Sequence, residues 1–200
     1  WFSDEANATA TYGHISDWNV SAVKNMCNAF KNKSTFNENI GKWDVSSVTD
    51  MRDMFRNATA FNQTIGNWDV SSVTSMRQMF RDATAFNQAI GNWDVSSVTD
   101  LRDMFNGATL FNQPIGNWEV SSVTNFKNMF SEATSFNQDI SDWNVSAGSD
   151  FSNAFFASNA LSDANKAVIH YAFKSNPNWT TDWSNYVGST PLNDSNFQTA

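Results

Sequence analysis

Residues 65–89 read IGNWDVSSVTSMRQMFRDATAFNQA, and residues 90–114 follow as IGNWDVSSVTDLRDMFNGATLFNQP. The same 25-residue pattern runs without an insertion through most of the 200-residue chain. One of its columns is a recurring tryptophan, found at Trp18, Trp43, Trp68, Trp93, Trp118 and Trp143. A fixed period of this length indicates a repeat protein, in which each unit buries its apolar face against its neighbours. We therefore expect a stack of five near-identical coils.

The apolar spacing changes within each coil. One face of a short helix is indicated by Val48, Met51, Met54, Phe55 and Ala58. Thr49 stands where such a helix would take its N-cap. The alternation across 61–65 and the segment 68–70 are typical of short strands, with a turn at Gly66. The spacing therefore predicts an α/β repeat in which each coil contains strand, turn, strand and short helix.

Both ends of the chain depart from the repeat. We expect three regions: an N-terminal cap over 1–14, the repeats over 15–160, and a C-terminal helical cap and tail over 161–200. Ser162 is the expected N-cap of a helix from Asp163 to about Lys174, whose core-facing stripe is Ala164, Ala167, Val168, Tyr171 and Ala172. The segment from Trp179 to Ala200 is expected to wrap the last coil, because a terminal coil otherwise leaves its apolar face open to water.

Composition narrows the possible functions. A net charge of −8 argues against nucleic acid or an anionic membrane as the partner, because both require a dense basic field. A single cysteine, Cys27, cannot form an intrachain disulfide framework or a cysteine-based metal cluster. No stretch of 18 apolar residues is present, so we expect no membrane span. Because residue 1 is not Met, we expect the sequence to begin after a signal segment.

Two blocks, WDVSSVTDM at 43–51 and MFRNATAFNQ at 54–63, resemble the repeats of the BspA-like leucine-rich-repeat surface proteins, also described as the DUF285 or mycoplasma lipoprotein-type repeat. The resemblance covers about residues 15–160. It implies a right-handed leucine-rich-repeat-like solenoid, capped at both ends, with secretion or surface display and a role in adhesion. It supplies no catalytic residue.

Several polar columns allow a functional and a structural interpretation. The recurring amides, Asn37, Asn62, Asn87, Asn112 and Asn137 with Gln63, Gln88, Gln113 and Gln138, form either a ligand-binding strip or a structural ladder, and we favour the ladder. The acidic column Asp44, Asp69, Asp94 and Glu119 suggests catalysis or calcium, but local turn bonds to the following serines are favoured. The basic column Arg52, Arg77, Arg102 and Lys127 is interpreted as a solvated charge mosaic beside Asp50, Asp53, Asp100 and Asp103.

Other recurring residues are assigned to the structure. The tryptophan column could stack on carbohydrate, but its fixed phase between Ile and Val favours the core. The threonine column, Thr49, Thr74, Thr99 and Thr124, could order water on an ice-binding face, but we interpret it as helix caps. His14 and His170 lie in the end segments without an evident nucleophile or metal partner.

One column differs from coil to coil: Asn39, Thr64, Ala89, Pro114 and Asp139. We predict that this variable column, flanked by Asn62, Asn87 and Asn112, is a recognition surface for a protein or glycan. The expected function is that of a monomeric, secreted or cell-surface binding and adhesion scaffold. We expect no catalytic residue, metal or cofactor. The alternatives are an ice-binding solenoid and a polysaccharide-degrading enzyme, which would require a unique acid–base cluster.

Overall fold

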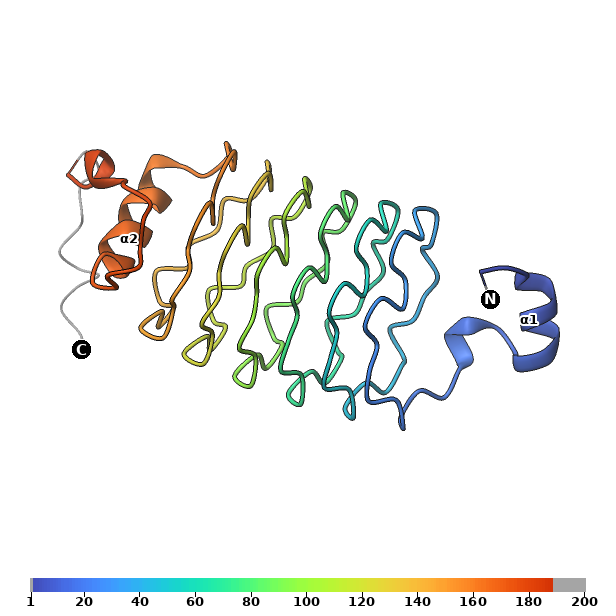
Figure 1. Ribbon diagram of the computed structural model, residues 1–200. Helices are drawn as coiled ribbons and strands as arrows, with labels where there is room; N and C mark the ends of the chain where they lie inside the picture. Colours follow the sequence, from blue (N-terminus) through green and yellow to red (C-terminus); the bar gives the residue numbers. More distant parts are fainter. Residues whose placement is uncertain (1, 189–200) are drawn as a thin grey trace.

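The computed structural model describes residues 2–188. Figure 1 shows open coils following one another in a row, with α1 (Glu5–Tyr12) at one end and α2 (Asp163–Phe173) at the other. Two short 3-10 helices, η1 (Ile15–Asp17) and η2 (Ser184–Tyr186), lie close to these ends. The molecule is therefore an elongated stack of 25-residue coils between two helical ends.

The predicted α/β leucine-rich-repeat solenoid is wrong. In the described part of the chain, both α-helices lie outside the coils, and no strand is present. The strand-like pairing between described residues of adjacent coils is limited to isolated parallel bridges, which join Asn25, Asp50, Ser75, Asp100, Asn125 and Asp150 in sequence. The short helix expected around Met51–Ala58 is absent, and a succession of turns takes its place.

Residues with positive φ explain why the helix does not form. Asp53 has φ 56° and Asn57 has φ 59°, four positions apart, and the same two positions have positive φ in the other coils. They are Asn28, Asn32, Gln78, Asp82, Asp103, Gly107, Asn128, Glu132, Asn153 and Ala157. A left-handed residue interrupts an α-helix, and Asn, Asp and Gly adopt this conformation most readily. The apolar residues keep a helix-like spacing while the backbone reverses every four residues.

Alternate backbone N–H groups in this segment bind to the next coil. Those of Met51, Asp53, Phe55 and Asn57 donate to the carbonyls 24 residues later over 2.8–3.2 Å. Most of the N–H groups between them close turns within the coil, as Arg56 N does to Asp53 O at 3.2 Å. Each coil is thus hydrogen-bonded to its neighbour without forming a regular strand.

The core consists of side-chain ladders along the stack. The rings of Phe55, Phe80 and Phe105 stack at centroid separations of 5.6 and 5.8 Å, and a second phenylalanine column runs beside them. The tryptophans from Trp43 to Trp143 are 3–8% exposed, which confirms their assignment to the core. Each donates its Nε1–H to the carbonyl of the isoleucine 28 residues earlier, over 3.0–3.2 Å. The buried tryptophans therefore also satisfy polar backbone groups.

The C-terminal end contains the expected helix. Ser162 is its N-cap and accepts a hydrogen bond from Asn165 N, as predicted, and the helix ends at Phe173. Its predicted core stripe is largely wrong: Ala167, Ile169 and Phe173 are buried, whereas Tyr171 is 47% exposed. The stripe is displaced because Phe173 packs toward the final coil.

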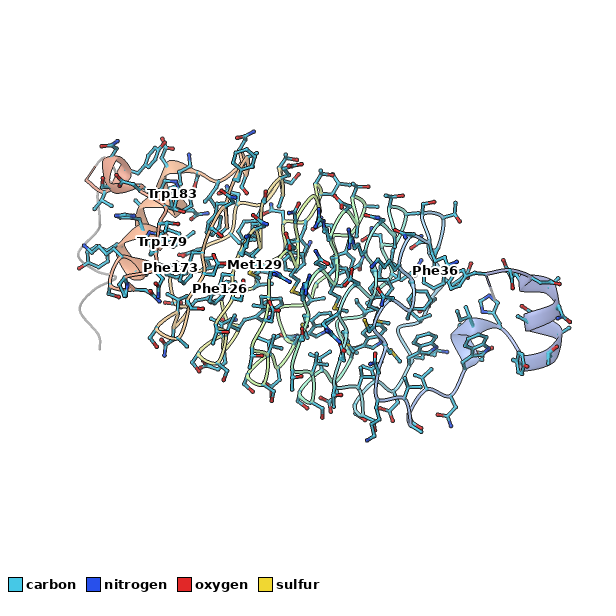
Figure 2. The ribbon with its side chains drawn as sticks, viewed as in Figure 1. Phe36, Phe126, Met129, Phe173, Trp179 and Trp183 are labelled. Atoms are coloured by element: carbon cyan, nitrogen blue, oxygen red, sulfur yellow. The ribbon has the colours of Figure 1, made fainter. Side chains whose placement is uncertain are left out.

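Aromatic side chains cover the two ends of the core. Figure 2 shows Trp179 and Trp183 at the C-terminal end of the stack. The Trp179 ring packs edge-on against Phe151 at a centroid separation of 5.6 Å, and the Trp183 ring centroid lies 5.1 Å from that of Phe155. The rest of the expected C-terminal wrap, 189–200, lies outside the described residues. At the other end Phe2 packs edge-on against the first two phenylalanines of the ladders at 5.8 and 5.7 Å. Helix α1 itself buries only Ala8.

Candidate binding surface

The variable column is exposed in all five coils, at Asn39, Thr64, Ala89, Pro114 and Asp139. The backbone beside it is tightly packed between coils. A Cβ at Gly116 would lie 2.7 Å from the carbonyl oxygen of Asp139, and Gly41, Gly66 and Gly91 show the same close approach to the next coil. A larger residue is therefore disfavoured at these four glycines, while the neighbouring variable position is exposed and differs from coil to coil.

A shallow hollow of about 180 Å³ opens on this column. It is lined by Ala89, Gly91, Asn92, Pro114 and Asn117. Two apolar side chains from adjacent coils and two amides are brought together here. The structure thus gives the middle of the variable column a definite shape, which the sequence alone did not show.

The amide columns form a structural ladder. Asn62 Oδ1 accepts hydrogen bonds from Asn87 N and Gln88 Nε2, both at 2.9 Å. The pattern continues along the stack as far as Asn165, whose Nδ2 lies 2.9 Å from Asn137 Oδ1. The predicted binding residues Asn62, Asn87 and Asn112 each stand two residues before a variable position in the sequence. Their Oδ1 atoms are occupied by bonds between coils.

The acidic column forms the local turns that we expected. Asp69 Oδ1 accepts from Ser71 N at 3.1 Å and from Ser71 Oγ at 2.6 Å. Equivalent serine bonds lower the pKa of Asp44, Asp94 and Glu119. Within residues 2–188, no group of three or more His, Cys, Asp or Glu is arranged to hold a metal ion.

The basic column is compensated by carboxylates at two positions. Arg52 pairs with Asp50 at 2.7 Å, and Arg102 lies 3.9 Å from Asp103. Arg77 forms no ion pair with any described residue, because its coil has Ser75 and Gln78 at the acidic positions. The charge-mosaic interpretation therefore holds at Arg52 and Arg102. The expected outer helix face is absent.

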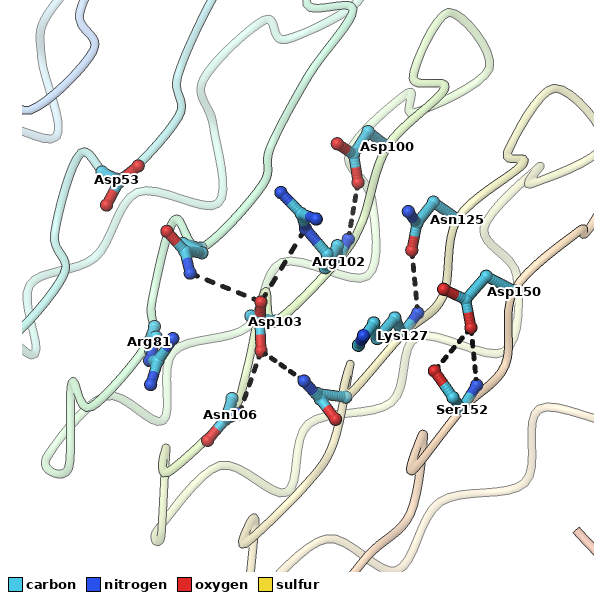
Figure 3. Close-up of polar contacts among 12 residues, drawn as sticks. Asp53, Arg81, Asp100, Arg102, Asp103, Asn106, Asn125, Lys127, Asp150 and Ser152 are labelled. Atoms are coloured by element: carbon cyan, nitrogen blue, oxygen red, sulfur yellow. Dashed lines mark hydrogen bonds and ion pairs between the residues drawn. The ribbon is translucent and has the colours of Figure 1, made fainter.

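A buried polar network was missed by the sequence reasoning. Asp103 is only 5% exposed and accepts from Asn128 Nδ2 at 2.9 Å, Asn106 Nδ2 at 3.1 Å and Gln78 Nε2 at 3.3 Å (Figure 3). When the side-chain amide of Gln78 is rotated by 180°, its nitrogen donates to Asp53 Oδ1 at 3.2 Å instead of to Asp103. Acid and amide thus alternate along this column, and that alternation was visible in the sequence.

The threonines are not helix caps. Thr74 donates its hydroxyl to Thr49 O at 3.2 Å, and the same bond recurs at each threonine of the column. At the C-terminal end, His170 Nδ1 lies 3.3 Å from both Trp179 Nε1 and Trp183 N. His170 therefore helps to hold the aromatic residues that cover the last coil.

No helix in the described range is long and apolar enough to cross a membrane.

The amino-acid sequence matches one known protein family. The family described as Mycoplasma protein of unknown function, DUF285, matches residues 2–97 and 88–186. Searches of curated proteins and of solved structures return no match. The two matched segments together span nearly the whole sequence, which confirms the resemblance to the DUF285 repeat. The chain belongs to the DUF285 family.

Proposed function

We propose that the chain is a non-catalytic binding scaffold, secreted or displayed on a cell surface, that recognises a protein or glycan through its variable column. The observation that carries this proposal is the contrast between neighbouring columns. The variable position is exposed in every coil, while the amides and glycines beside it are committed to contacts between coils. In repeat proteins an extended surface of this kind can change its specificity without disturbing the core.

The shape of the surface favours a partner that contacts several coils. The hollow of about 180 Å³ is smaller than the 300–1,000 Å³ typical of small-molecule sites. A ligand would therefore gain affinity from several modest contacts along the stack. Ice binding is less well supported, because the threonine hydroxyls donate to backbone carbonyls.

The test is to capture a ligand with a glycan array and a pull-down of surface proteins, and then to alter the column. Single substitutions T64R, A89R and P114R are expected to weaken binding of the captured ligand stepwise, and the triple variant to abolish it while the thermal melt is retained. R77A, in the basic column and away from the variable column in the sequence, serves as the control because Arg77 forms no ion pair with a described residue. Loss of binding in R77A with unchanged binding in the triple variant would place recognition elsewhere. Cleavage of a polysaccharide by the purified chain would contradict a non-catalytic role.

A further inference from the structure

We propose that the two ends of the coil stack are complementary surfaces, and that copies of this chain join head to tail, first coil on last coil, when the C-terminal segment 163–188 is displaced. The partner of each end is thus a second copy of the chain. This inference goes beyond the proposed function, because it concerns contacts between copies and leaves the variable column out. It rests on unpaired backbone groups and on the charges at the two ends.

The last coil has four backbone N–H groups without an acceptor. In each of the preceding coils the equivalent groups donate to carbonyls 24 residues later, as Phe126 N does to Asp150 O at 2.8 Å. Within residues 2–188 no acceptor is present for the corresponding groups of the last coil, which belong to Phe151, Asn153, Phe155 and Ala157. Phe151 is only 2% exposed, and buried backbone N–H groups are nearly always paired in folded proteins. The last coil is therefore covered without being fully hydrogen-bonded.

The C-terminal segment forms its hydrogen bonds to other groups of the stack. Asn176 Nδ2 donates to Val145 O at 2.7 Å and to Gly148 O at 2.9 Å. Asn165 Nδ2 donates to Asn137 Oδ1 at 2.9 Å. Figure 1 shows α2 beside the last coil, where a further coil would lie. The segment takes the place of that coil but supplies none of the four carbonyls that it would offer.

The first coil offers these carbonyls in the matching register. In the part of the chain that the structure describes, no donor reaches the carbonyl oxygens of Asn25, Cys27, Ala29 and Lys31. Asn25 and Asp150 begin and end the series of bridges between coils. Asn25 of a second copy can therefore continue the series after Asp150, with its carbonyl facing Phe151 N. The other three carbonyls then meet the other three N–H groups in order.

The N-terminal segment covers the first coil only lightly. Helix α1 buries Ala8 alone, and Phe2, which packs edge-on against Phe30, is 42% exposed. Ala29 is exposed, whereas the equivalent Met54 of the second coil is fully buried. Displacement of the Phe2 ring would thus open the core of the first coil to another copy.

The charges of the two ends are complementary. The first coil, residues 15–39, contains three lysines and two acidic residues, which gives a net charge of +1. The last coil, residues 140–164, contains three aspartates and no Lys or Arg, which gives −3. Opposite charges favour the meeting of unlike ends and oppose the meeting of two last coils. Contacts between unlike ends of identical copies are heterologous, and they extend into filaments when they do not close.

The experiment follows disulfide formation between two full-length proteins, because Cys27 in the first coil is equivalent to Ser152 in the last. The first protein is wild type. The second carries W179A/W183A to displace the C-terminal segment, with C27S and S152C to move its cysteine to the last coil. Its matched control carries S97C in place of S152C, at an exposed serine in the middle of the stack. Equivalent rings of adjacent coils lie 5.6–6.2 Å apart, and disulfide-bonded cysteines have Cα atoms about 4.4–6.8 Å apart.

In a glutathione redox buffer, the S152C protein is expected to form at least about fivefold more mixed disulfide with wild type than the S97C protein forms. Mass spectrometry after digestion quantifies the two products. A29R in the otherwise wild-type partner should abolish this preference, because it places a charged side chain at the junction. Its melting temperature should be retained, because Ala29 is exposed.

Thermal melts verify the fold of every variant, and W183A alone replaces W179A/W183A if the double variant does not fold. Equal coupling of the S152C and S97C proteins would show random collision and overturn the proposal. Absence of coupling, or coupling that A29R leaves unchanged, would overturn it as well.

Discussion

Asn57 has φ 59°, and its Nδ2 donates to Asn32 Oδ1 at 2.7 Å in the neighbouring coil. In a later coil the equivalent position is Gly107, with φ 70°. Asparagine and glycine are the residues that adopt this conformation at the lowest cost. The turn segment thus requires residues that tolerate positive φ at these positions, and this requirement is separate from the apolar pattern of the core.

Asn57→Val is therefore expected to destabilise the protein by about 1–2 kcal/mol more than Asn57→Gly, because a β-branched residue is strained at positive φ. Both variants lose the hydrogen bond to Asn32, so their difference isolates the backbone conformation. Urea unfolding provides the free energies. Equal stability of the valine and glycine variants would mean that position 57 is not left-handed.

Gln78 separates two carboxylates, Asp53 and Asp103, in a column that is largely buried. Gln78→Glu is expected to destabilise the fold by about 1–3 kcal/mol at pH 7, because it places a third negative charge between them. Repulsion would raise the pKa of the new carboxyl in the folded state. The deficit should therefore shrink as pH falls toward 4. Gln78→Asn, which adds no charge, is the control, and an equal deficit in both at every pH would contradict this explanation.

At the scale of elements, the recurring residues of the sequence predicted the core positions and the C-terminal helix. The core positions at Phe80 and Trp93 were correctly placed, and so was the helix that begins after Ser162. The prediction of a short helix in each coil was wrong. Apolar residues at i, i+3 and i+4 also face one side of the chain when it forms successive four-residue turns that each contain a left-handed residue. The two Asn/Asp-rich columns carried the opposing signal. Partners 24 to 28 residues away, such as Ile65 for Trp93, could be deduced only once the coil path was known.

Deletion of residues 161–200 tests the C-terminal element. It removes Trp179 and Trp183 from Phe151 and Phe155, and it removes the bonds from Ser162 N and Asn165 to Asn137. The exposed apolar end is expected to cause self-association, measured by analytical ultracentrifugation, and a lower melting temperature. A monomer with unchanged thermal stability would show that the helix is not needed to cover the last coil.

At the scale of the whole molecule, acid should weaken the stack. A hydrogen bond from Arg52 lowers the pKa of Asp50, and one from Ser152 lowers the pKa of Asp150. A carboxyl whose pKa is lower in the folded state stabilises the fold above about pH 4. That contribution is lost as pH falls through the folded pKa. The melting temperature should therefore drop between pH 5 and pH 2.5, and a constant or rising value would contradict these bonds.

The central claim about the molecule is that its coils stack through turns and side-chain ladders without a regular helix in any repeat. Helical content by far-UV circular dichroism tests this most directly. The described residues contain 8 α-helical residues in α1 and 11 in α2, which gives 19 in total. We therefore predict a helical signal equivalent to about a tenth of the 200-residue chain. A signal two to three times larger, as one short helix per coil would produce, would contradict the account.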